Sequence, residues 1–88
     1  MSSLEKQRVD QRVLNVVQRM FEERSIRREV SVDDVLTGVG LTSLDTVKLV
    51  LLVESEFDLT IPLPHITPAN FRSIASISGL VNRLMAGA

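Results

Sequence analysis

The spacing of apolar and polar residues along this 88-residue chain predicts three amphipathic helices and no strands. Over residues 7–24, apolar side chains recur every three or four positions, so they share one broad face of a helix. They are Val9, Val13, Leu14, Val16, Val17, Met20 and Phe21, with Gln11, Asn15, Gln18 and Glu22 opposite. Because valine lowers helix propensity slightly, we expect this helix to be stabilised mainly by packing of its apolar face.

A second helix is predicted to begin at or beside Ser43. Thr42 and Ser43 are both suitable N-cap residues, Asp45 puts an acid in the first turn, and Pro62 lies beyond the C-terminal end. One stripe of this helix is suited to packing on a core: Thr46, Leu49, Val50, Val53 and Phe57.

The same helix carries a second apolar stripe, made of Leu44, Val47 and Leu51, on roughly the opposite side. A chain of this length cannot easily bury both stripes. Either the helix is enclosed on all sides, with the second stripe covered by the preceding loop or by the segment after Pro62, or this stripe faces a partner.

The rest of the chain predicts a long loop, a short helical turn and a last helix. Residues 25–41 should contain no long element, only a capped turn at residues 31–34, and should pack through Val30, Val32, Leu36 and Leu41. Thr67 and Pro68 are expected to start a short helical turn through Phe71. Ser73 is expected to cap the last helix, whose apolar stripe is Ile74, Ile77, Leu80, Val81, Leu84 and Met85. Residues 1–5 should be irregular.

We therefore expect one all-α domain over residues 1–88, a small bundle of three main helices and one short one, with a long loop between the first two.

Composition excludes several classes of function. Ten basic and eleven acidic residues leave a net charge of −1, so nothing favours binding to nucleic acid or to an anionic membrane. The chain has no cysteine and a single histidine, which excludes disulfides and cysteine- or histidine-rich metal sites. It has no apolar run of membrane-spanning length, and we expect a cytoplasmic location.

Residues with catalytic or metal-binding chemistry are few. Ser43 does not lie in a G-x-S-x-G motif, and His65 is isolated, so no catalytic residue is expected. Glu54, Glu56 and Asp58 are spaced so that Glu56 points away from the other two, which predicts a solvated face and no metal site. The charged residues 24–29 are either a docking patch or solvated charges near a helix end, and the second is the simpler interpretation.

The stretch from Gly40 to Pro62 resembles the acyl and peptidyl carrier proteins. It combines Gly-Leu-Thr-Ser-Leu-Asp at a helix start, Glu-Ser-Glu-Phe-Asp at the helix end and an Ile-Pro exit, and the similarity covers roughly residues 32–84. The resemblance implies that a phosphopantetheinyl transferase attaches 4′-phosphopantetheine from coenzyme A to Ser43. It also implies that the following helix contacts partner enzymes, through Thr42, Leu44, Val47, Lys48 and Leu51. Carriers of fatty-acid synthesis usually have an acid in place of Thr42 and a more acidic helix.

The expected function is that of a free-standing, monomeric, non-enzymatic carrier. It would hold acyl or aminoacyl groups as thioesters and present them to an adenylating loading enzyme and to a downstream synthase or transferase. The segment from Ile61 to Ile74 resembles carriers of polyketide and nonribosomal peptide pathways. The alternative is a helical adaptor, or a degenerate carrier, without a prosthetic group.

Overall fold

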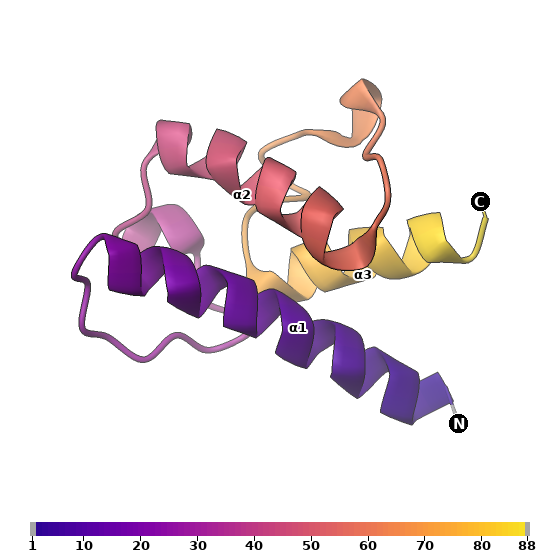
Figure 1. The fold of residues 1–88 in the computed structure, drawn as a ribbon, viewed down its shortest axis with the longest axis horizontal. Helices are drawn as coiled ribbons and strands as arrows, with labels where there is room; N and C mark the ends of the chain where they lie inside the picture. The colour runs from indigo at the N-terminus through magenta and orange to yellow at the C-terminus, as the bar shows by residue number, and fades with distance from the viewer. Residues whose placement is uncertain (1, 88) are drawn as a thin grey trace.

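The computed structural model describes the backbone of residues 2–87 and the side chains of residues 8–87. This part of the chain forms three α-helices, α1 (Ser2–Glu23), α2 (Ser43–Phe57) and α3 (Ile74–Met85), and two 3₁₀ helices, η1 (Leu36–Val39) and η2 (Leu63–His65). It contains no strand, so the predicted all-α bundle with a long first loop is confirmed. α1 begins at Ser2, whereas an irregular start through residue 5 was expected. Figure 1 shows α2 lying above α1, with α3 behind them.

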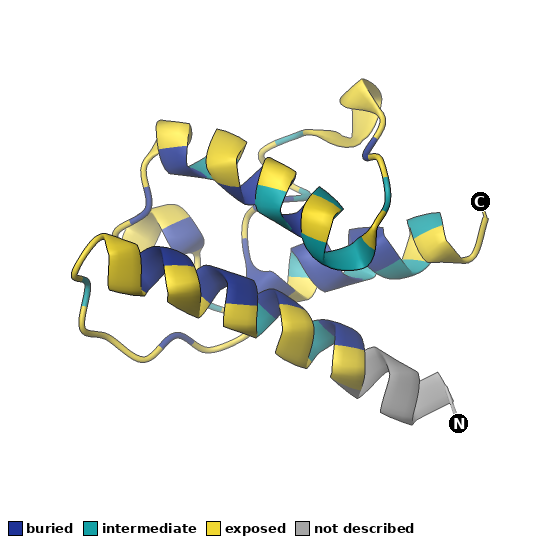
Figure 2. Ribbon diagram, in the orientation of Figure 1, coloured by how far each residue is buried: buried dark blue, intermediate teal, exposed yellow. Residues whose placement is uncertain are grey.

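The core lies between α1 and the inner faces of α2 and α3. Both of these helices pack on α1. The predicted face of α1 is buried, except that Leu14 is only partly covered. In α2, Leu49, Val50 and Val53 are buried, as expected for the first stripe. Figure 2 shows these buried stripes on the facing sides of the helices. In α3 the predicted stripe holds as far as Leu84, but Met85 is exposed because the helix ends there.

The helix starts are fixed by side-chain caps. Thr42 is the N-cap of α2, and its hydroxyl oxygen accepts a hydrogen bond from the Asp45 backbone N–H at 3.2 Å. Of the two candidates, Ser43 is therefore the first helical residue and not the cap. The predicted cap of α3 is confirmed, because the Ser73 hydroxyl accepts from the Ser76 backbone N–H at 3.1 Å.

The long loop packs on the bundle largely as predicted. Val30, Leu36 and Leu41 are buried, but Val32 is exposed and contacts α3 through its carbonyl, which accepts from the Ala75 backbone N–H at 2.9 Å. The loop also contains η1, which the sequence pattern did not predict. Gly40, after η1, has a φ of 125°, and a Cβ there would lie 3.1 Å from Ile26 Cδ1, so this position favours glycine.

The segment between α2 and α3 differs from the prediction in one respect. Residues 67–71 form a single turn and not a fourth helix: the Thr67 hydroxyl accepts from the Asn70 N–H at 3.2 Å, and the Phe71 N–H donates to the Thr67 carbonyl. The chain bends at Arg72 and enters α3, which ends the turn. Before it, Pro64 lies near the start of η2, where its missing N–H costs no helical hydrogen bond.

Candidate functional site

Ser43 is the first residue of α2 and is exposed. The capping interactions belong to Thr42 and Asp45, so the Ser43 hydroxyl is not needed to hold the helix start. The backbone N–H groups of Ser43 and Leu44 lie in the first turn, where an α-helix provides no internal acceptor. These free N–H groups make up the positive end of the helix dipole, which favours an anion at this position.

Asp45 anchors this end of α2 to α1. Its carboxylate accepts from the Thr42 backbone N–H at 2.8 Å and from the Thr42 hydroxyl at 3.0 Å, and it forms an ion pair with Arg24 just beyond α1. The Thr42 backbone N–H is the main reason that the pKa of Asp45 lies below its ordinary value of 3.8; the Thr42 hydroxyl and Arg24 lower it further, while burial opposes them. Thr42 and Asp45 thus form a capping box, which the Thr-x-x-Asp spacing indicates, so Asp45 does more than the dipole role expected from the sequence.

The second apolar stripe of α2 is exposed. Leu44 is 82% exposed, and Val47 and Leu51 are 61% exposed each, so neither the long loop nor the segment after Pro62 covers them. Thr42 and Lys48 are exposed beside them, and Lys48 forms an ion pair with Glu23 of α1. The residues predicted to bind partners, Thr42, Leu44, Val47, Lys48 and Leu51, therefore lie near Ser43 on the outer side of α2, which Figure 2 shows as largely exposed.

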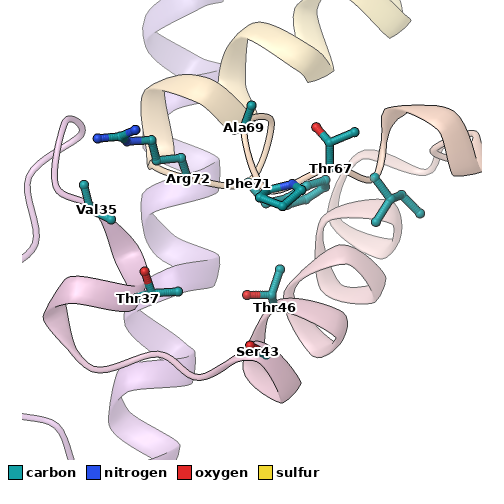
Figure 3. A pocket seen from close by; sticks show the side chains of 10 residues that line it. Val35, Thr37, Ser43, Thr46, Thr67, Ala69, Phe71 and Arg72 are labelled. Carbon is teal, nitrogen blue, oxygen red and sulfur yellow. The ribbon is translucent and has the colours of Figure 1, made fainter.

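A surface depression of ≈ 710 Å³ lies beside Ser43, and no local pattern of residues indicated it. Three separate segments of the chain line it: the η1 region, the start of α2 and the turn before α3. Figure 3 shows Ser43 and Thr46 of α2 on one side, Thr37 of η1 on another, and Phe71 and Arg72 from the turn above them. Its lining mixes hydroxyl groups and a guanidinium with apolar side chains.

The acids near the end of α2 form a solvated face only in part: Asp58 is exposed, but Glu54 and Glu56 are half-buried and engaged within the protein. Glu54 accepts from the Ile61 backbone N–H at 2.7 Å, and Glu56 pairs with Arg12 at 2.9 Å. Asp58 is the C-cap residue, with a φ of 50°. Within the described part of the chain, no group of three His, Cys, Asp or Glu residues could hold a metal ion.

Of the charged residues 24–29, Arg24 pairs with Asp45, while Arg27, Arg28 and Glu29 are exposed. His65 lies on η2 and is not among the residues that line the depression. The helices described here include none that is both long and apolar enough to cross a membrane.

Residues 11–83 match the family model described as "Phosphopantetheine attachment site". The chain belongs to the phosphopantetheine-binding carrier proteins. The carrier is 41% identical over 73 residues to aminoacyl carrier protein 1 of Bradyrhizobium diazoefficiens, covering 83% of this chain and 81% of the relative. It is 40% identical over 80 residues to aminoacyl carrier protein 2 of the same organism, covering 90% of each.

The fold of the carrier also agrees with solved structures. It matches a carrier protein in the crystal structure of Bradyrhizobium japonicum glycine:[carrier protein] ligase complexed with glycylated carrier protein, with a TM-score of 0.71 and 40% identity, over 82% of this chain and 97% of that one. A second complex of that ligase, with its cognate carrier protein and an analogue of glycyl adenylate, gives a TM-score of 0.73 over 85% and 97%. In both, the ligase is a separate protein.

The family membership confirms three expectations from the sequence. The prosthetic group of the carrier is covalently bound 4′-phosphopantetheine. The carrier is not an enzyme, and in the solved relatives the ligase is a separate chain. The fold is that of the helical carrier proteins.

Proposed function

We propose that Ser43 is the residue that bears 4′-phosphopantetheine and that the carrier holds an aminoacyl group delivered by an adenylate-forming ligase. This assignment is supported by the exposed hydroxyl of Ser43, which lies at the first position of α2 and takes no part in the cap made by Thr42 and Asp45. When bound, the prosthetic group supplies a thiol on which the cargo is held as a thioester.

The residues around Ser43 fit a phosphodiester. The N–H groups of Ser43 and Leu44 can donate to its oxygens, and the helix dipole contributes about 0.3 to 1 kcal/mol. The nearest carboxylate on α2 is that of Asp45, whose charge is compensated by the Thr42 N–H and by Arg24. A new negative charge at Ser43 therefore meets little repulsion from this helix.

A small polar cargo is supported by two lines of argument. The relatives named above are aminoacyl carrier proteins, and the solved relatives are bound to a ligase that uses glycine. In this chain, Val13, Val17, Ile77 and Leu80 fill the centre of the bundle and are fully buried. The depression beside Ser43 lies at the surface, and hydroxyl groups and a guanidinium interrupt its apolar lining, which suits an aminoacyl group better than a long alkyl chain. Of the two pathway types suggested by the sequence, aminoacyl cargo favours peptide-type assembly over polyketide assembly.

The test is the intact mass of the protein after incubation with coenzyme A and a broad-specificity phosphopantetheinyl transferase. Wild type should gain one phosphopantetheine, Ser43→Ala should gain none, and Ser55→Ala, a control at an exposed serine of the same helix, should behave as wild type. The modified protein is then incubated with the Bradyrhizobium glycine ligase, glycine and ATP, and a further gain of one glycyl group is expected. An unchanged mass of wild type in the first step would instead favour the adaptor alternative.

A further inference from the structure

All three carboxylates of α2 are engaged by other parts of the protein. Asp45 is held by the Thr42 backbone and Arg24, as described above. Glu54 accepts from the Ile61 backbone N–H at 2.7 Å. Glu56 accepts from Arg12 Nε at 2.9 Å and lies within 3.3 Å of Arg19. The acidic residues of this helix therefore point toward Arg24, α1 and Ile61 and do not belong to its outward face beside Ser43.

The outward face of α2 beside Ser43 consequently has an unusual charge pattern. This face presents the apolar side chains of Leu44, Val47 and Leu51. The charged side chain of α2 that lies among them is the basic Lys48. Lys48 is paired with Glu23, but the two side chains are 51% and 57% exposed. An ion pair so accessible to water is weak and screened, so Lys48 can exchange Glu23 for a carboxylate of a partner.

We propose that the loading ligase docks on this face through an apolar patch with a carboxylate placed opposite Lys48, and not through a basic surface. This inference rests on the function proposed above and specifies the chemistry of the partner. Apolar contacts to Leu44, Val47 and Leu51 provide most of the buried area, and the single charge fixes the register of docking. A basic partner surface would meet Lys48, with no carboxylate of α2 and only Glu23, already paired with Lys48, to compensate, which disfavours that partner.

The test uses the glycine:[carrier protein] ligase of the Bradyrhizobium relative as the probe and measures kcat/KM for glycylation of the phosphopantetheinylated carrier. Lys48→Glu should lower kcat/KM by about tenfold, because it places like charges against each other, while Lys48→Gln should lower it by less than about threefold. The double variant Glu23→Lys, Lys48→Glu keeps the ion pair and the net charge but reverses the sign at position 48, so it should also be slow. Arg8→Glu makes the same charge change at an exposed position near the other end of α1 and should load as wild type.

Different failures have different meanings. If wild type is phosphopantetheinylated but not glycylated, the ligase assignment in the proposed function is wrong, and this inference fails with it. If wild type is glycylated and Lys48→Glu is as fast or faster, the partner surface is neutral or basic and only this inference is overturned. A fall of more than about tenfold in kcat/KM between about 0.05 and 0.5 M salt would also overturn this inference, because so steep a salt dependence requires several charge pairs across the interface.

Discussion

The anchoring of α2 by Asp45 can be tested by Asp45→Ala. The substitution removes the acceptor of the Thr42 N–H in a largely buried site, which costs about 1 to 2 kcal/mol. It also removes a favourable acid from the first helical turn, about 0.3 to 1 kcal/mol. The Arg24 side chain is 45% exposed, so loss of that ion pair adds at most about 1 kcal/mol. Together these contributions span about 1.3 to 4 kcal/mol, and we expect a loss in the middle of that range, about 2 to 3 kcal/mol.

The assay is urea unfolding followed by far-UV circular dichroism. For a domain of this size the slope is of order 1 kcal/mol per M urea, so the midpoint should fall by about 2 to 3 M. Asp33→Ala, which changes an exposed acid of the loop, is the matched control and should stay within about 0.5 kcal/mol of wild type.

The pH dependence provides an independent check with Asp45→Asn. Because the pKa of Asp45 is lower in the folded protein than its ordinary value of 3.8, its contribution is fully present above that value. The contribution disappears as the pH falls through the lower, folded-state pKa. The stability difference between wild type and Asp45→Asn should therefore be constant from pH 7 to about 5 and shrink below about pH 4. A difference that stays the same down to pH 2, or a cost of Asp45→Ala below about 0.5 kcal/mol, would show that Asp45 does not anchor α2.

Three further predictions follow from individual side chains. Ser43→Ala should change the free energy of unfolding by less than about 0.5 kcal/mol, because Thr42 is the cap; a loss above about 1 kcal/mol would mean that Ser43 itself caps α2. Leu51→Asp should leave the urea midpoint nearly unchanged while slowing glycylation, whereas Leu49→Asp, two residues away but buried, should cost several kcal/mol; equal destabilisation by both would place Leu51 in the core. Ser78 is buried, and its hydroxyl has no hydrogen-bond partner among the described residues, so Ser78→Ala should be neutral or stabilising by up to about 1 kcal/mol; clear destabilisation in thermal unfolding would reveal a partner.

The apolar faces of α1 and α3 could be predicted from the sequence because helical periodicity is a local property. Val13, Val17, Ile77 and Leu80 recur at helical spacing and are fully buried in the structure. The cap at Ser73 was likewise predictable, since a cap involves residues only three positions apart.

Periodicity could not decide which apolar stripe of α2 is covered. Both the stripe containing Leu49 and the stripe containing Leu51 are apolar, and the position of the neighbouring elements makes one side core and the other surface. Nor could the sequence decide which residue caps α2, because Thr42 and Ser43 are both suitable N-cap residues. The backbone geometry makes Thr42 the cap.

Contacts between residues far apart in the chain were decided by the tertiary structure alone. Arg24 and Asp45 are 21 positions apart, and Arg12 and Glu56 are 44 apart, so no local pattern pairs them. These pairs turn the acids of α2 inward and leave Lys48 on its outer face. The depression beside Ser43 exists only because η1 and the turn before α3 fold against the start of α2. The sequence thus determined the helices and the candidate serine, through spacing that local physics controls, while packing determined the charge and shape of the surface around that serine.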